Sequence, residues 1–224
     1  EVAGNSIFAI MKGSGTINSN TGNLVRYDVE DASVKTYDCL HELSDKEISR
    51  ISYNEATGRL LMLYSTGNID LLDAEDNVVN IYALKDASIF GKSVNSISHV
   101  GKYAYLCMDF DIIEVDMDLG IVCETYKNVV PVFSIQSLGN KIYVSRSDGL
   151  YQISDRTMMH DPNNWLKVAD GVFEVMQAFA DRLYALKNTR LCYLVPNESG
   201  LTITETSYYF KTIDAFSDYL LCTD

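Results

Sequence analysis

The stretch that decides the fold is RISYNEATGRLLMLYSTGNIDLLDAEDNVVNIY, residues 50–82 of a 224-residue chain. It contains four short runs rich in Val, Ile, Leu and Tyr, at residues 50–53, 59–64, 68–72 and 78–82. Segments rich in Gly, Asn and Asp separate the runs. β-branched, aromatic and aliphatic residues at this spacing favour strands, whereas Gly, Asn and Asp favour turns. The stretch therefore predicts four consecutive short strands.

The same unit recurs along the chain. Its first run can be anchored on Ile51, Ile97, Ile135, Met176 and Ile213, which gives steps of 46, 38, 41 and 37 residues. Each anchor is followed by a turn and a second apolar run, at residues 59–64, 102–106, 141–144, 182–186 and 218–222. Four strands in a unit of about 40 residues are the signature of a β-propeller blade. We therefore expect an all-β fold, a β-propeller of four-stranded antiparallel blades, with about five to six blades in this chain.

The blades do not divide the chain evenly. Residues 6–11, 23–28 and 33–37 predict three strands of an opening blade, four complete units follow, and residues 213–222 supply two strands of another. Either the terminal strands complete one mixed blade, or the chain is part of a longer protein, and we favour the second explanation. We therefore expect residues 1–224 to form a single β-propeller domain within a longer, multidomain protein.

Little in the sequence predicts a helix. Ser44 with Glu47 three residues later resembles a capping box at a helix start. The segment is only one turn long and leads into a strand, so we expect a loop.

Charge and hydropathy exclude several classes of partner. The chain carries 18 Lys and Arg against 31 Asp and Glu, a net charge of −13. Recognition of phosphates requires clustered Lys and Arg, so we expect no nucleic-acid partner and no electrostatic docking on an anionic membrane. No apolar run approaches the roughly 18 residues of a membrane-spanning helix, so no transmembrane segment is expected in this chain. No signal-peptide pattern is visible at its start.

Cysteine usage leaves two interpretations open. None of the five cysteines belongs to a CxxC motif or has zinc-finger spacing; they are Cys39, Cys107, Cys123, Cys192 and Cys222. We favour buried free thiols that behave as small hydrophobic residues, with a disulfide between distant cysteines as the alternative. The odd number leaves at least one thiol unpaired in either case.

Catalytic motifs are not found in the sequence. His41, His99 and His160 are far apart and lack HxH or HExxH spacing, and we expect them at surface or turn positions. No nucleophile elbow, dinucleotide-binding loop or P-loop is present, and Gly13-Ser14-Gly15-Thr16 is expected to be a flexible hairpin insertion. We therefore predict no enzyme, no catalytic, cofactor-binding or metal-binding residue and no cofactor, and we leave the ligand-binding residues undetermined.

Acidic clusters are the first set of candidate site residues. They are Asp73, Glu75 and Asp76, then Asp109 and Asp111, then Asp116 and Asp118. Their oxygens could bind Ca²⁺, and carboxylates from different blades could pair for glycoside chemistry. None of them matches an EF-hand loop, and each cluster lies where a hairpin turn is expected. We favour the interpretation that they form turns.

Aromatic residues are the second set. The candidates are Tyr208, Tyr209 and Phe210, with Phe173, Phe179 and Trp165. Exposed aromatic side chains bind sugars or peptides, and Tyr is enriched at interfaces. We favour packing between blades for these residues.

Two resemblances to known families follow from particular motifs. Leu43-Ser44-Asp45, with Gly58 and the string Tyr64–Asp70, resembles a two-component-regulator propeller repeat, although Glu42 stands where that family has Gly. A closer resemblance covers about residues 23–127, and it is to the N-terminal propeller of PorZ-like proteins of Bacteroidota. The strings that carry it are Val25-Arg26-Tyr27-Asp28, Leu43-Ser44-Asp45, residues 64–72, Val94-Asn95 with Ile97, and residues 101–106, whereas Phe110-Asp111 departs from the family's Phe-Gly.

The PorZ-like resemblance implies a periplasmic or cell-surface protein that belongs to type IX secretion. It implies protein partners, and glycan or lipopolysaccharide binding through the parent protein, because the family's lipopolysaccharide site is in a separate C-terminal domain. It transfers no binding residue to this chain. Our first hypothesis is therefore a non-catalytic, extracytoplasmic interaction platform. The alternatives are a periplasmic ligand-sensing propeller of a hybrid two-component regulator and, third, a polysaccharide-degrading enzyme.

Overall fold

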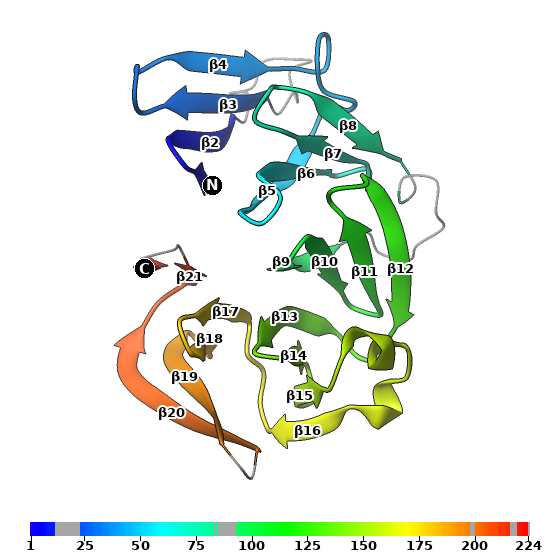
Figure 1. Ribbon diagram of the computed structural model, residues 1–224, viewed down its shortest axis with the longest axis vertical. Coiled ribbons are helices and arrows are strands. Elements are labelled where there is room, and N and C mark those ends of the chain that lie inside the picture. The colour runs from blue at the N-terminus through cyan, green and yellow to red at the C-terminus, as the bar shows by residue number, and fades with distance from the viewer. Residues whose placement is uncertain (12–22, 83, 85–92, 198–199, 216–218, 224) are drawn as a thin grey trace. The chain divides into compact units, whose positions relative to one another are not determined.

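The computed structural model describes residues 1–11, 23–82, 84, 93–197, 200–215 and 219–223. The predicted hairpin insertion at residues 13–16 lies outside these residues. The described part of the chain forms five four-stranded antiparallel sheets and one two-stranded sheet (Figure 1). Within each four-stranded sheet, the strands lie in sequence order, as in a propeller blade. The predicted all-β propeller of about five to six blades is confirmed.

The first sheet corrects the strand count expected for the opening blade. It has four strands, not three: β1 (Val2–Ala3), β2 (Ser6–Met11), β3 (Asn23–Asp28) and β4 (Val34–Tyr37). The strand missed is β1, whose two residues pair with Ile7 and Ser6 of β2. Two residues are too few to show a strand periodicity in the sequence.

The remaining sheets follow the predicted units closely. The second contains β5 (Ile48–Asn54), β6 (Arg59–Tyr64), β7 (Ile69–Leu72) and β8 (Val78–Ile81). The third contains β9 (Val94–Val100), β10 (Tyr103–Met108), β11 (Asp111–Asp116) and β12 (Ile121–Lys127). The fourth contains β13 (Val132–Leu138), β14 (Lys141–Arg146), β15 (Gly149–Ile153) and β16 (Leu166–Ala169). The fifth contains β17 (Val175–Phe179), β18 (Arg182–Lys187), β19 (Arg190–Asn197) and β20 (Gly200–Tyr209), and the two-stranded sheet contains β21 (Thr212–Ala215) and β22 (Leu220–Thr223).

Helical structure among the described residues is limited to two short 3₁₀ helices between β15 and β16. They are η1 (Arg156–His160) and η2 (Pro162–Asn164). Asp155 and Asp161 cap them by accepting hydrogen bonds from the backbone N–H groups of Thr157 and Asn163. The capping-box segment at Ser44 is a loop, as expected. Within the part of the chain that the structure describes, no helix has the length and apolarity needed to span a bilayer.

The chain divides into two compact units, each with its own core. One unit comprises Glu1–Lys92 and Val115–Val122, and the other comprises Ser93–Glu114 and Cys123–Asp224. In the first unit, one apolar cluster joins the first and second sheets; its fully buried members include Leu24, Tyr37, Leu60 and Met62. The repeat therefore has a physical reason within this unit: the first sheet buries one of its faces against the second.

The second unit has two clusters of the same kind. One joins the third and fourth sheets and includes Tyr105, Ile112, Val144 and Ile153. The other joins the fourth and fifth sheets and includes Tyr143, Leu150, Phe173 and Leu183. The first strands β9, β13 and β17 of these three sheets lie side by side (Figure 1).

A buried carboxylate explains the most specific string of the sequence, residues 64–70. The side chain of Asp70 is inaccessible to solvent. It accepts hydrogen bonds from the Tyr64 hydroxyl (2.6 Å), the Asn80 amide (2.7 Å) and the backbone N–H of Ser44 (2.8 Å). Burial and this hydrogen bond raise the pKa of Tyr64. Asp70 therefore ties the turn before β5 to strands β6, β7 and β8.

The turn between β6 and β7 adds two further constraints. Gly67 has a φ of 86°, a conformation that side-chain-bearing residues rarely adopt. The hydroxyl of the neighbouring Thr66 donates to Asp45 at 2.7 Å. The Leu43-Ser44-Asp45 motif is thus held at Ser44 by Asp70 of β7 and at Asp45 by Thr66 of the turn that follows β6.

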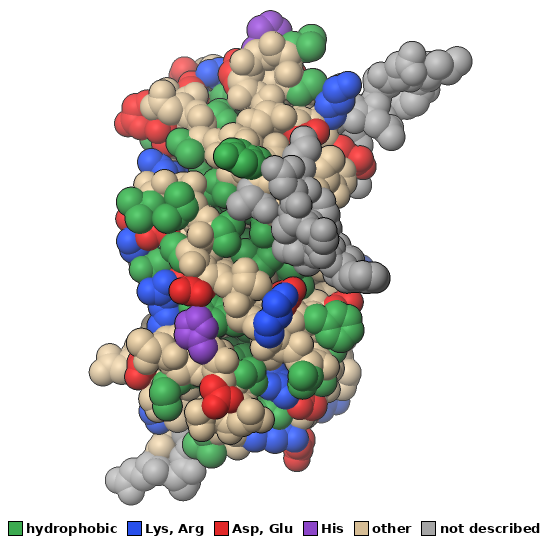
Figure 2. All heavy atoms as spheres, turned by 90° about the vertical axis from the view of Figure 1, so that its right-hand side faces the viewer, with side chains coloured by type: hydrophobic (Ala, Val, Ile, Leu, Met, Phe, Trp, Pro, Cys, Tyr) green, Lys and Arg blue, Asp and Glu red, His purple; other side chains and the backbone are tan. Residues whose placement is uncertain are grey.

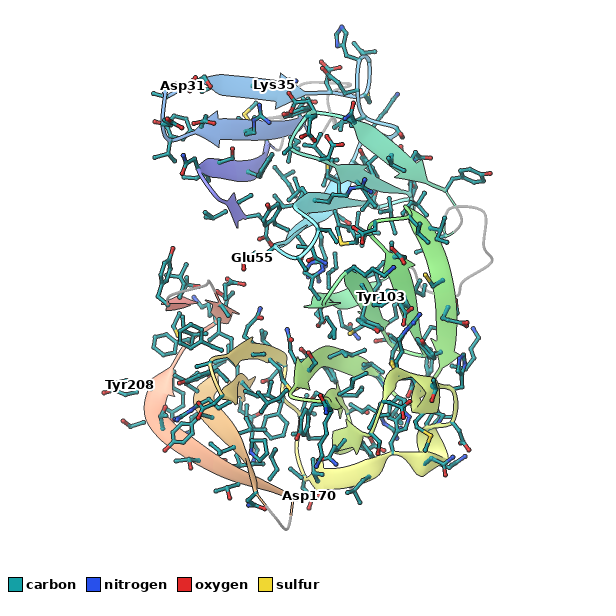
Figure 3. The ribbon with its side chains drawn as sticks, viewed as in Figure 1. Asp31, Lys35, Glu55, Tyr103, Asp170 and Tyr208 are labelled. Atoms are coloured by element: carbon teal, nitrogen blue, oxygen red, sulfur yellow. The ribbon has the colours of Figure 1, made fainter. Side chains whose placement is uncertain are left out.

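Replacing Asp70 with Ala should destabilise the protein by about 3 kcal/mol, because the buried Tyr64 hydroxyl and the donors of Asn80 and Ser44 would lose a charged acceptor. Asp70→Asn, which keeps one acceptor oxygen, should recover part of the loss. Glu55→Ala is the matched control, since Glu55 is an exposed acid of the same unit (Figure 3). Urea unfolding followed by circular dichroism measures the difference, and equal stability of the Asp70→Ala and Glu55→Ala variants would contradict the role assigned to Asp70.

Candidate functional site

The acidic clusters at residues 73 and 116 are turns, as predicted. Asp73 accepts hydrogen bonds from the backbone N–H groups of Glu75 (3.0 Å) and Asn77 (2.8 Å). Asp116 accepts from the N–H groups of Asp118 and Leu119, both at 3.0 Å. These carboxylates are therefore used to close their own turns.

Other acids of the same clusters are neutralised by cations. Asp76 contacts Arg26 and Lys35, each at 2.7 Å, and accepts a hydrogen bond from the Tyr37 hydroxyl. Asp111 does not lie in a turn, so the prediction is wrong at this residue. It begins β11, is buried, and pairs with Lys127 at 2.8 Å.

No acidic cluster predicted from the sequence gathers three metal donors among the described residues. The group that does consists of Asp38, His41 and Glu42, whose donor atoms lie within 4.8 Å of one another. On the face shown in Figure 2, acidic and basic side chains are interspersed among the described residues rather than gathered by sign. The negative net charge therefore does not concentrate into one site on this face.

A second buried carboxylate lies in the other compact unit. Glu114 of β11 is inaccessible to solvent, and the Arg156 guanidinium from η1 contacts both of its oxygens, with Nε at 2.7 Å from Oε2. The Tyr126 hydroxyl donates to Glu114 at 2.8 Å. Arg156 also lies over the ring of Tyr103, 4.2 Å from its centroid. The hydrogen bond to Glu114 raises the pKa of Arg156.

This arrangement suits a structural anchor better than an acid–base catalyst. A buried carboxylate is tolerated when it is paired and its lone pairs are satisfied. Glu114 has one cation and the hydroxyl of Tyr126 as partners, and burial followed by the interaction with Glu114 raises the pKa of Tyr126. Glu114 therefore fixes η1, and with it the connection between β15 and β16, against the third sheet.

Polar side chains also join the first strands of the second unit. The Ser98 hydroxyl accepts from the N–H of Ile135, and the Ser134 hydroxyl accepts from the N–H of Met176, both at 3.1 Å. The amide of Gln136 donates to Gln177 at 3.2 Å. Strands β9, β13 and β17 belong to three different sheets and do not pair through their backbones. Side-chain hydrogen bonds connect them instead.

The histidines lie apart from one another in sequence and fold. His41 and His160 are exposed, as predicted, and the His160 ring lies 4.9 Å from that of Tyr126. His99 is neither in a turn nor on the open surface, so that prediction is wrong. It lies half-buried in β9, and burial lowers its pKa to about 4. Successive side chains of a strand point to opposite faces of the sheet, and the face on which His99 lies is partly covered.

The cysteines are free thiols, so no disulfide forms in the structure. Cys107 and Cys192 are buried, and burial raises the pKa of Cys107 to about 12. Cys39, Cys123 and Cys222 are only half-buried. The free state confirms the favoured interpretation, whereas full burial holds for two of the five.

Packing accounts for part of the aromatic set. Phe173 is fully buried, and Trp165 is nearly so, with its indole N–H donating to the Met158 carbonyl at 3.1 Å. Phe179 packs edge-on against Tyr184. For Tyr208 and Tyr209 the packing prediction is wrong, because their exposed fractions are 64% and 52%.

A bulge in β20 explains why these two tyrosines are exposed. Arg190 is opposite Tyr209 and Cys192 is opposite Glu205, so β20 has extra residues between these pairs. The Arg190 guanidinium donates to the Tyr209 hydroxyl at 2.6 Å and pairs with Glu205 at 2.8 Å. Tyr208 points away from the strand (Figure 3). Bulges are frequent beside functional sites, where they change the direction in which a side chain points. We call Arg190, Tyr208 and Tyr209 the β20 patch.

Replacing Arg156 with Met should destabilise the protein by about 3 kcal/mol, because a buried carboxylate would lose its cation. Adding Glu114→Gln to that variant should restore at least half of the loss. Arg182→Met is the control, since Arg182 forms an exposed pair with Asp181. Urea unfolding checks both variants, and a double variant less stable than Arg156→Met alone would contradict the charge-pair explanation.

His99 should make stability dependent on pH. Its folded-state pKa of about 4 lies below its ordinary value of 6.5, so protonation favours the unfolded chain. The contribution is complete above pH 6.5 and decreases as the pH falls toward 4. Between pH 7 and 4.5, the wild type should lose about 2–3 kcal/mol more than His99→Gln. Urea unfolding at the two pH values tests this, with His160→Gln as control. Equal pH dependence of wild type and His99→Gln would contradict it.

Comparison with known proteins identifies a matching family and similar solved structures. A model of the PorZ (TSS9) N-terminal β-propeller domain family matches residues 19–166. No curated protein matches the chain. The structure of PorZ, a surface component of the type IX secretion system of Porphyromonas gingivalis, aligns with a TM-score of 0.76 and 23% identity. The alignment covers 90% of this chain and 27% of the PorZ chain, so this chain spans about a quarter of that protein's length.

Other solved structures share the fold at lower identity. The extracellular domain of the hybrid two-component system BT4673 from B. thetaiotaomicron aligns with a TM-score of 0.58 and 13% identity, over 95% of this chain and 27% of the other. The computationally designed protein Ika8 aligns with a TM-score of 0.61 and 7% identity, over 98% of this chain and 65% of the designed chain. At these identities the likeness shows the fold alone. The family model covers more than half of the chain, and the chain therefore belongs to the family of PorZ N-terminal β-propeller domains.

Proposed function

We propose that this chain is a non-catalytic, extracytoplasmic interaction platform within a longer PorZ-like surface protein. The observation that carries the proposal is the β20 patch, where the exposed Tyr209 is held by Arg190 and the neighbouring Tyr208 is also exposed. Tyr and Arg are enriched at the centres of protein interfaces, where they supply large contact areas with a polar end. The partners that this surface fits are proteins.

Rigidity of the β20 patch supports the same proposal. The Tyr209 hydroxyl accepts two hydrogen bonds from Arg190, and Arg190 is also held by Glu205. Lys187 contacts Glu205 as well, at 3.2 Å. Side chains already held in place lose less conformational entropy on binding, which favours association.

We expect any glycan or lipopolysaccharide binding to reside in other parts of the parent protein. The two buried carboxylates described above are engaged within the fold: Asp70 binds Tyr64 and Asn80, and Glu114 binds Arg156. The alternative function, a periplasmic sensor propeller of a hybrid two-component regulator, is supported by the shared fold of the BT4673 extracellular domain.

Site-specific cross-linking in cells tests the platform. A photo-reactive phenylalanine analogue at position 208 of the full-length parent should give a discrete adduct with another protein. Tyr82 is the matched control, because it is the same residue type with the same exposed fraction of 64%. Absence of an adduct at 208, or equal adducts at 208 and 82, would count against the β20 patch.

A glycan and lipopolysaccharide screen separates the two functions. The isolated chain should bind neither class of molecule, whereas the full-length parent should bind lipopolysaccharide. Tight binding of a defined oligosaccharide by the isolated chain would favour the sensor function and overturn the platform.

A further inference from the structure

The connection between β4 and β5 begins with a tight turn, residues 38–43, that is held at both ends. Tyr37 before it and Leu43 at its end are both buried in the core of the first unit. The carbonyl of Asp38 accepts hydrogen bonds from the N–H groups of His41 (3.4 Å), Glu42 (3.1 Å) and Leu43 (2.9 Å). This is the backbone pattern of one helical turn. Side chains three and four positions after Asp38 therefore lie on its side of the turn.

Those two positions carry His41 and Glu42, which gives one imidazole and two carboxylates on one side. Their donor atoms lie within 4.8 Å of one another. The His41 Nδ1 and Asp38 Oδ1 atoms form a hydrogen bond and are 2.9 Å apart. Two adjacent ligands, each about 2.1 Å from one metal ion, are about 3 Å apart when they subtend a right angle. The observed spacing thus matches two neighbouring positions of a coordination sphere.

We propose that Asp38, His41 and Glu42 form a binding site for a divalent transition-metal ion such as Zn²⁺ or Ni²⁺. Imidazole nitrogen favours these ions, whereas Ca²⁺ takes six to eight oxygen ligands. Three protein ligands leave coordination positions open to water or to a carboxylate from a partner. The site is independent of the β20 patch, which lies in the other compact unit.

The chain offers two internal comparisons for this site. His160 lies 4.0 Å from Glu124, so it has an exposed imidazole with one carboxylate rather than two. Cys39 lies within the turn but outside the three-residue group. Binding that depends on His41 but not on His160 or Cys39 identifies the turn as the site.

Calorimetric titration of the untagged chain with ZnCl₂ and NiCl₂ tests the proposal. The wild type should bind one ion, and His41→Ala and Glu42→Gln should each weaken binding by at least about tenfold, since even loss of a ligand's supporting partner costs 10–100-fold. His160→Ala and Cys39→Ser should bind as the wild type does. Unchanged binding in His41→Ala, or an equal loss in His160→Ala or Cys39→Ser, would overturn the site.

A second set of measurements distinguishes loss of the metal site from misfolding of a variant. Circular dichroism should show wild-type strand content for every variant. In the wild type, NMR signals of the His41 ring should shift on adding Zn²⁺ while those of His99 stay in place. A shift confined to His160, or no shift at His41, would also overturn the site.

Discussion

The structure depends on the burial of apolar faces between consecutive sheets. A four-stranded sheet of short strands has two faces, and it cannot cover them alone. Within each compact unit the apolar clusters are accordingly shared by two sheets, as where Tyr143 of the fourth sheet packs with Leu183 and Leu194 of the fifth. The repeat in the sequence results from this constraint, because every four-strand repeat must present a similar pattern of apolar runs to the sheets beside it.

Much of the fold could be predicted from the sequence because the repeated runs are local. Strands such as β6 and β14 have the aliphatic and aromatic composition that identifies them without knowledge of the rest. Strand β1 escaped prediction, since Val2 and Ala3 carry no periodicity and form a strand only because β2 is beside them. The 3₁₀ helices were missed for a similar reason: each is one turn or little more, held by an aspartate cap.

Candidate sites were harder to predict because they depend on distant residues. Glu114 and Arg156 are 42 positions apart, and no local pattern connects them. The exposure of Tyr208 results from a bulge whose register is set by β19, so the string of aromatics alone pointed to packing. In contrast, the group of Asp38, His41 and Glu42 has a spacing that is visible in the sequence, and a search for three-and-four spacings would have found it.

Two kinds of polar residue can now be distinguished in this propeller. Asp70 and Glu114 are buried and saturated with donors, so they specify how turns and helices attach to the sheets. The β20 patch and the turn that begins at Asp38 are exposed and lie outside the repeated pattern. A repeated core with individual surface features is the usual way in which one fold supports different functions.

Native-state hydrogen exchange of the Tyr143→Ala variant tests the shared burial most directly. Tyr143 belongs to β14, but it packs in the cluster formed with the fifth sheet. If consecutive sheets are stable only together, its removal should lower amide protection in β18 and β19 as much as in β14. Loss of protection confined to β13, β14, β15 and β16 would show that the sheets are stable separately and would contradict the constraint.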